Sequence, residues 1–220
     1  MKLSIFNGSP KLGINNTGIL LESFITGFQE TPDNEVEMIR MNNEQSYKDA
    51  AIRFEAAEAV LIAFPLYSYA MPAGVKTFLE QLEPLLGKCT GKKVGFLVQF
   101  GFVEAIHARG LEKYLEHLTK ALDCDYEGII IKGGCDGISR NKKGAKKILM
   151  GAYEIGKTYG IEKVFNKEQL DKYSAPEIQK KQNPFVMKIL FRLINKLYWE
   201  KSFKKNGVTY ESSFARPYEN

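Results

Sequence analysis

Six consecutive apolar residues, Ala59 to Phe64, constrain the fold of this chain more than any other segment. No polar residue interrupts the run, so neither of its faces is suited to contact with water. Such a run is typical of a parallel strand covered on both faces, because parallel sheets carry helices on both sides. We therefore expect a sheet enclosed between two helical layers.

A short apolar strand followed by an amphipathic helix recurs five times up to about residue 160. Strands are predicted at Lys2–Phe6, Glu35–Met41, Ala59–Phe64, Val94–Val98 and Gly128–Ile131, and helices at Thr17–Phe28, Tyr47–Glu58, Pro72–Leu86, Glu104–Leu122 and Asn141–Tyr159. Five β–α units in succession predict an α/β fold with a doubly wound parallel sheet. We expect a domain at residues 1–160 and a helical, basic C-terminal extension at residues 161–220.

The net charge of +5 is unevenly distributed along the chain. Residues 1–160 carry 19 Lys or Arg and 19 Asp or Glu, whereas residues 161–220 carry 12 and 7. Nucleic-acid binding depends mainly on neutralising phosphates, so a neutral body argues against a nucleic-acid partner.

The three cysteines, Cys89, Cys124 and Cys135, show no CxxC or CxxxC spacing. The sequence therefore predicts no metal site and no iron–sulfur cluster, only reduced thiols.

The N-terminus turns into a loop too early for a signal peptide, and no apolar run reaches the roughly 18–20 residues that span a bilayer. A cytoplasmic location is expected.

The loop from Asn7 to Thr17 follows the first strand and leads into a helix. Hydroxyls, side-chain amides and free N–H groups at a helix N-terminus suit a phosphate group. Asn16 or Thr17 would also serve as an ordinary N-cap, which leaves Ser9 and Lys11 unexplained. The loop contains neither a Walker A motif nor GxGxxG, which disfavours ATP and dinucleotide folds.

Two further loops are expected at the same edge of the sheet. Residues 65–73 contain Leu66, Tyr67, Tyr69 and Met71, where polar turn residues are usual. These side chains suit a flat heteroaromatic ring, although they could instead pack under the next helix. In residues 99–104, a glycine would let the backbone approach a ligand and Gln99 offers an amide, while the two Phe residues could form a subunit contact.

These motifs resemble the NAD(P)H-dependent FMN reductases of the flavodoxin-like superfamily over about residues 1–160. The resemblance rests on Asn-Gly-Ser-Pro-Lys and Asn-Asn-Thr after the first strand, and on Phe-Pro-Leu-Tyr, Met-Pro-Ala and Lys76-x-Phe78-Leu79 after the third. It implies a flavodoxin-like sheet of order 2-1-3-4-5, bound FMN, and NADPH or NADH as reductant. The family's phosphate contacts fall on Ser9, Lys11, Asn16 and Thr17, with Asn15 as an alternative to Asn16. Its isoalloxazine contacts fall on Pro65, Leu66, Tyr67 and Ser68, flanked by Gln99, Phe100, Gly101 and Phe102. The iron–sulfur branch is related, but its cysteine cluster is missing here.

The resemblance predicts hydride transfer from NAD(P)H through the flavin to a small acceptor such as a flavin or quinone. No catalytic acid or base is required for that step, and none is assigned. His107 and His117 are expected on the solvated face of a charged helix. The alternative is an electron carrier of flavodoxin type, disfavoured by the neutral body and by a second loop without Trp. A flavin-free signalling domain would need an acidic cluster after the first strand, which is absent.

The extension contains an aromatic, basic helix predicted at Phe185–Trp199. We expect it to pack on the body or on a second subunit of a homodimer. The alternative is that it lies on an anionic membrane surface.

Overall fold

The computed structural model describes residues 1–141, 143–181 and 183–216. Contacts along the chain divide it into two units, Met1–Gln179 and a second unit that begins at Lys180. Each unit is described by itself below.

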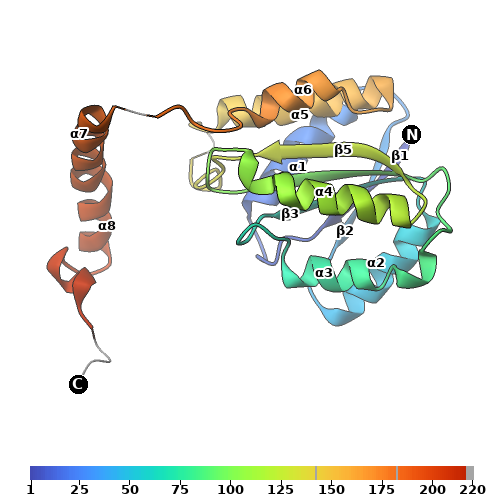
Figure 1. Cartoon of the computed structure of the whole chain (residues 1–220), viewed down its shortest axis with the longest axis horizontal. Coiled ribbons are helices and arrows are strands. Elements are labelled where there is room, and N and C mark those ends of the chain that lie inside the picture. Colours follow the sequence, from blue (N-terminus) through green and yellow to red (C-terminus); the bar gives the residue numbers. More distant parts are fainter. Residues whose placement is uncertain (142, 182, 217–220) are drawn as a thin grey trace. The chain divides into compact units, whose positions relative to one another are not determined.

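The first unit is built on a parallel sheet of five strands, and its order is β2-β1-β3-β4-β5 (Figure 1). The strands are β1 (Lys2–Asn7), β2 (Glu35–Arg40), β3 (Ala59–Pro65), β4 (Lys93–Gln99) and β5 (Asp125–Lys132). The expected five-stranded, doubly wound sheet of order 2-1-3-4-5 is confirmed.

Strand β3 is the centre of the sheet, and all seven of its residues are buried. It pairs with β1 on one side and with β4 on the other. The edge strand β2 contrasts with it, because only Ile39 of its six residues is buried. This difference explains why the sequence of β3 is continuously apolar and that of β2 alternates.

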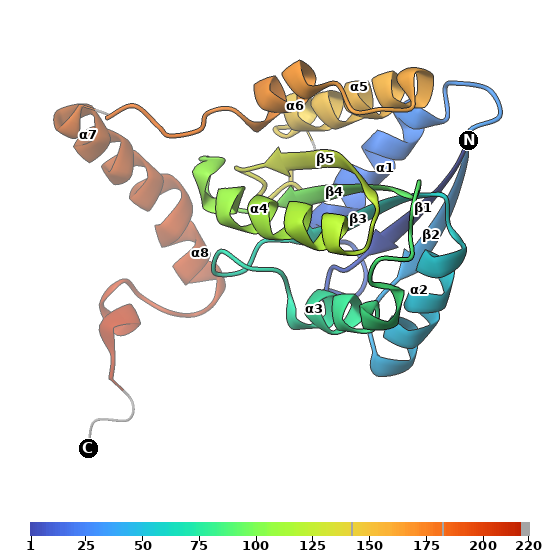
Figure 2. The same cartoon turned by 45° about the vertical axis from the view of Figure 1, so that its right-hand side comes forward.

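Helices cover both faces of the sheet, as Figures 1 and 2 show. They are α1 (Asn16–Phe28), α2 (Glu44–Ala56), α3 (Ala73–Glu80), α4 (Ile106–Ala121), α5 (Lys146–Glu162) and α6 (Lys167–Ser174). Buried residues of α2, α3 and α4 form one apolar core with the sheet. Residues of α1 and α5, with Leu170 of α6, form the other core. The helices expected on both faces are therefore confirmed.

Several elements differ from the sequence expectation in extent. Helix α3 ends at Glu80, and a separate 3₁₀ turn, Glu83–Leu85, follows it. Helix α6 was not predicted. Lys163, in the left-handed conformation, ends α5, and Asn166 caps α6 through a hydrogen bond from the Gln169 N–H. The expected domain end at residue 160 lies in the last turn of α5, and the first unit continues to Gln179.

The second unit is one helical segment followed by a turn. It runs through α7 (Pro184–Ile194), a π-helical stretch (Asn195–Trp199) and α8 (Glu200–Lys205), with a 3₁₀ turn at Glu211–Phe214. The helix predicted at 185–199 thus lies within a longer helical segment. Among the described residues, no helix is long and apolar enough to cross a membrane.

The close approach of α1 and α5 gives a test of the packing. A Cβ at Gly156 would lie 1.9 Å from the carbonyl oxygen of Phe24, whereas a Cβ at Gly110 on α4 would meet nothing within 4 Å. Gly156→Ala is expected to lower the free energy of unfolding by about 2 kcal/mol, because the backbone of α1 cannot give way. Gly110→Ala is the matched control and should raise it by about 0.5–1 kcal/mol through helix propensity. Urea denaturation measures both, and an equal effect of the two substitutions would contradict this packing.

Candidate active site

Three loops meet at the carboxyl edge of the sheet because the strands end in register. Asn7 lies beside Ala63, Pro65 beside Gln99, and Gln99 beside Lys132. The backbone pairing continues past the strand ends. The N–H of Gly8 donates to the Ala63 carbonyl at 2.8 Å, that of Leu66 to the Gln99 carbonyl at 2.9 Å, and that of Phe100 to the Lys132 carbonyl at 3.1 Å. Each loop is therefore held to its neighbour by the backbone.

Asn15 organises the loop between β1 and α1. Its side-chain oxygen accepts a hydrogen bond from the Gly18 N–H at 2.9 Å, which makes it the N-cap of α1. Its side-chain nitrogen donates to the carbonyls of Lys11 at 3.2 Å and Gly13 at 2.9 Å. Two carbonyl oxygens that would repel an anion are thus bound to an amide. Asn15 therefore fixes the shape of the loop.

Asn16 and Thr17 are also engaged within the protein. The Asn16 amide donates to the Cys135 carbonyl at 2.9 Å and accepts from the Ser139 N–H at 3.2 Å, so it binds the loop after β5. Thr17 is fully buried, and its hydroxyl oxygen accepts from Gln99 Nε2 at 3.2 Å. This bond joins the first loop to the third.

Groups that can bind an anion lie in the loop before α1 and in its first turn, where the Thr17 hydroxyl accepts from Gln99 and can still donate. Ser9 is half-buried and Lys11 is exposed. Within the described part of the chain, the backbone N–H groups of Asn16 and Thr17 have no acceptor, as is usual in the first turn of a helix. Free N–H groups, a hydroxyl and a lysine at a helix N-terminus form a typical phosphate site.

A cavity of about 420 Å³ lies between the second and third loops. It is lined by Leu66, Ser68, Tyr69, Phe100, Gly101, Phe102, His107 and Asp136. Five of these are the ring contacts that the resemblance implies, and Tyr69 is one of the aromatic loop residues expected to suit a ring, whereas His107 and Asp136 were not predicted. Pro65, Tyr67 and Gln99 lie outside the lining: Pro65 and Gln99 are buried at their strand ends, and Tyr67 is exposed. Gly101 has a clear role, because a Cβ there would lie 2.5 Å from Asp136 Oδ2.

The aromatic second loop contains a tight turn in an unusual backbone conformation. The Tyr67 N–H donates to the Ala70 carbonyl at 2.8 Å, and the Ala70 N–H donates to the Tyr67 carbonyl at 2.9 Å. The two residues between them, Ser68 and Tyr69, have φ values of 49° and 66°. A turn with two left-handed residues normally uses Asn and Gly, so Ser and Tyr are strained there. Leu66 and Met71 do pack against the core, as the alternative interpretation held, but Tyr67 and Tyr69 are exposed.

The expectation that His107 lies on a solvated face is wrong. Its side chain is 18% exposed and lies among three aromatic rings. The ring centroids of Phe102, Tyr69 and Phe100 are 4.8, 5.3 and 6.3 Å from that of the imidazole. The sequence could not show this, because the aromatic residues come from two other loops. His117, on the same helix, is exposed as expected.

The segment that follows α6 holds His107 in position. The N–H groups of Ala105 and Ile106 donate to the carbonyls of Pro176 and Glu177, which satisfies the start of α4. The Gln179 N–H donates to Glu104 Oε1 at 3.0 Å, while Glu104 Oε2 lies 3.5 Å from His107 Nε2. Residues beyond 160 therefore hold the start of α4, the helix that carries His107.

The cysteine near this edge is not suited to catalysis. Cys135 is buried below the first loop, and burial raises the pKa of its thiol to about 12. A thiol with so high a pKa is not a nucleophile at neutral pH. In the described ranges, no cluster of three or more His, Cys, Asp or Glu could hold a metal ion.

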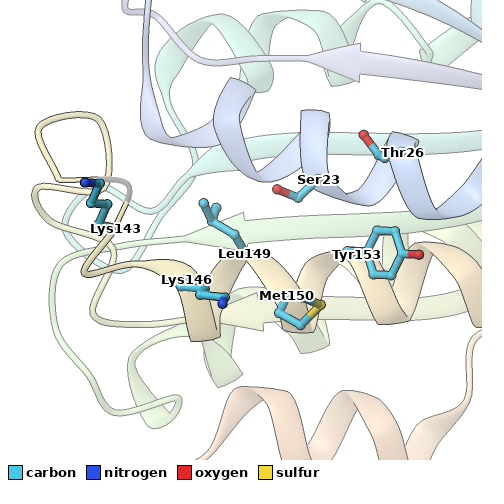
Figure 3. Close-up of a pocket in the computed structure, with 7 residues that line it drawn as sticks. All are labelled: Ser23, Thr26, Lys143, Lys146, Leu149, Met150 and Tyr153. Carbon is cyan, nitrogen blue, oxygen red and sulfur yellow. The ribbon is translucent and has the colours of Figure 1, made fainter.

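A second cavity, of about 470 Å³, lies between α1 and α5 (Figure 3). It is lined by Ser23, Thr26, Lys143, Lys146, Leu149, Met150 and Tyr153. The hydroxyls of Ser23 and Thr26 bind carbonyls of their own helix, and that of Tyr153 binds Glu30. Because its hydroxyls are already engaged, this cavity is a weaker candidate than the edge of the sheet, which combines aromatic rings, a histidine and free N–H groups.

The chain belongs to the family described as having a flavodoxin-like fold, whose model matches residues 1–124. In that fold, ligands bind outside the carboxyl ends of the strands, which is where the three loops lie. Among curated protein sequences, none matches the chain.

Solved structures show the same fold at low sequence identity. An NADPH-quinone reductase from P. pentosaceus is 16% identical, with a TM-score of 0.52, and the match covers 70% of this chain and 96% of that one. An azoreductase from Bacillus anthracis is 15% identical, with a TM-score of 0.52, and the match covers 73% and 99%. General stress protein 14 from Treponema denticola, in complex with FMN, is 13% identical, with a TM-score of 0.52, and the match covers 72% and 97%.

The strained turn gives a test of the site geometry. Replacing Ser68 and Tyr69 by Asn and Gly together is expected to raise the free energy of unfolding by about 1 kcal/mol, because these residues adopt left-handed conformations readily. The matched control is Tyr67→Gly in the same loop, where φ is ordinary, and it should lower that energy by roughly 0.5–1 kcal/mol. Urea denaturation distinguishes the two signs; destabilisation by the double variant would show that the turn is not strained.

Proposed function

We propose that this chain binds FMN and uses NADPH or NADH to reduce a small acceptor such as a flavin or quinone. One observation carries the proposal: a loop with free N–H groups at a helix N-terminus is joined through the Thr17–Gln99 hydrogen bond to the third loop, whose next residue, Phe100, lines an aromatic cavity. A ribityl phosphate and a flat ring need two such neighbouring sites. The cavity volume of about 420 Å³ is in the usual range for small-molecule sites.

The similar structures support this assignment. One of them is a complex with FMN, and others are an NADPH-quinone reductase and an NADH:FMN oxidoreductase. Their fold is that of this chain, and the loops described above lie where that fold binds its ligands. Homodimer formation and a cytoplasmic location remain predictions.

FMN, when bound, supplies the electron chemistry itself. Ser9, Lys11 and the first N–H groups of α1 would hold the phosphate, while Leu66, Tyr69 and Phe102 would contact the ring. His107 is the lining group best suited to give a proton to the reduced acceptor at neutral pH, because imidazole exchanges protons readily there. Glu104 Oε2, 3.5 Å from His107 Nε2, helps to hold the imidazole in position.

Comparing FMN with riboflavin isolates the phosphate contact. The full chain should bind FMN at least a hundredfold more tightly than riboflavin, since several charge-assisted hydrogen bonds are lost without the phosphate. Ser9→Ala should weaken FMN binding by about tenfold and leave riboflavin binding unchanged. The control Ser23→Ala removes a hydroxyl that binds its own helix, and it should alter neither affinity. Flavin fluorescence titration measures all of these, and equal affinity for the two flavins would refute a phosphate site in this loop.

The His107 role has its own test. His107→Gln should lower the rate of acceptor reduction by about 10²-fold, since general acid catalysis contributes that much or more, without changing the affinity for FMN. His117→Gln, on the exposed part of the same helix, should leave both unchanged. Stopped-flow kinetics separates the two half-reactions, and a normal acceptor rate in His107→Gln would exclude the role.

Anaerobic mixing with NADH or NADPH distinguishes the enzyme from an electron carrier. Bleaching of the bound flavin by either nicotinamide is the expected result. A chain that binds FMN but is reduced by neither would be a carrier of flavodoxin type.

A further inference from the structure

The helical segment of the second unit presents apolar side chains that are not buried within that unit. From Asn183 to Lys201, every described residue except Met187 is exposed. Val186, Leu190, Leu193 and Leu197 follow one another at helical spacing and are 55%, 45%, 51% and 61% exposed. A continuous apolar stripe of this kind is typical of a binding surface, because exposed apolar area is unfavourable in water.

The charged residues of the same helix lie on another side, which they share with the exposed Phe185 and Ile189. Lys188, Arg192 and Lys196 follow one another at intervals of four residues, and Asn195 lies between the last two. No acidic residue occurs between Lys180 and Trp199, in contrast to the electrically neutral body. A helix that combines an exposed apolar stripe with charged residues that are all basic complements an anionic bilayer, in which acyl chains lie below charged headgroups.

Aromatic residues follow the amphipathic stretch. The ring centroids of Trp199 and Phe203 are 6.2 Å apart, those of Phe203 and Tyr210 6.5 Å, and those of Tyr210 and Phe214 5.1 Å. Trp and Tyr favour the boundary between headgroups and hydrocarbon, since one part of each side chain is apolar and another is polar.

We propose that the segment Pro184–Lys205 binds the surface of an anionic lipid bilayer. The stripe from Val186 to Leu197 enters the acyl boundary, and Lys188, Arg192 and Lys196 contact the headgroups. The segment lies on the bilayer and does not span it. This inference does not depend on the reaction at the sheet edge.

Vesicle co-sedimentation of the full chain tests the proposal. The chain should pellet with vesicles of roughly three parts phosphatidylcholine to one part phosphatidylglycerol, and much less with phosphatidylcholine alone. Replacing Lys188, Arg192 and Lys196 together by Gln should lower the partition coefficient on the order of a hundredfold, because each basic residue near the surface contributes about a factor of five. Leu190→Asn with Leu197→Asn should also abolish pelleting, since the apolar stripe is lost.

The control removes the same charge from the body. Lys48, Lys113 and Lys172 are exposed residues of α2, α4 and α6, and their joint replacement by Gln should leave vesicle binding unchanged. Far-UV circular dichroism and urea denaturation of every variant show that the body is folded. Absence of pelleting with the anionic vesicles, or equal losses in the two triple variants, would overturn the proposal. A dimer in gel filtration that Leu190→Asn with Leu197→Asn dissociates, together with no vesicle binding, would assign the stripe to a contact between copies.

Discussion

The candidate site depends on a parallel backbone ladder that does not stop where the strands end. Hydrogen bonds continue from Gly8 to Ala63, from Leu66 to Gln99 and from Phe100 to Lys132. The Gly134 and Cys135 N–H groups then bind the carbonyls of Phe102 and Phe100. Each loop is held by backbone groups, which leaves side chains and the first N–H groups of α1 for a ligand. Because the loops are already ordered, less entropy is lost in ordering them when a ligand binds.

The strained turn of the second loop and the contacts at the start of α4 complete the site. The turn at Ser68–Tyr69 adopts a conformation that suits neither residue, and it places the Tyr69 ring beside His107. The residues after α6 bind the start of α4 and fix Glu104 next to the imidazole. A segment outside the five β–α units therefore fixes the start of α4, and the first unit extends to Gln179.

The sequence predicted the sheet well because the pattern of apolar residues within each strand follows from which of its faces are buried. The run at 59–64 is typical of a strand covered on both faces, and the structure buries all of β3. Helix ends were less accurate: α3 ends at Glu80 and α5 begins at Lys146, because caps and turns decide these positions. Helix α6 was missed since its eight residues contain few apolar positions, and tertiary contacts of Leu170 stabilise it.

The sequence alone determined the order of β–α units, the polar loop after the first strand and the aromatic loop after the third. It also determined the contrast between a neutral body and a basic, aromatic extension. Only the tertiary structure decided which side chains of those loops are available. Asn15, Asn16 and Thr17 look equivalent as candidate phosphate ligands in the sequence, yet their side chains bind other parts of the protein. Likewise, the sequence shows His107 only as one of two histidines on a charged helix. The structure places it among Phe100, Phe102 and Tyr69. The reason is that a side chain's role depends on partners distant in the chain, and only folding brings those partners together.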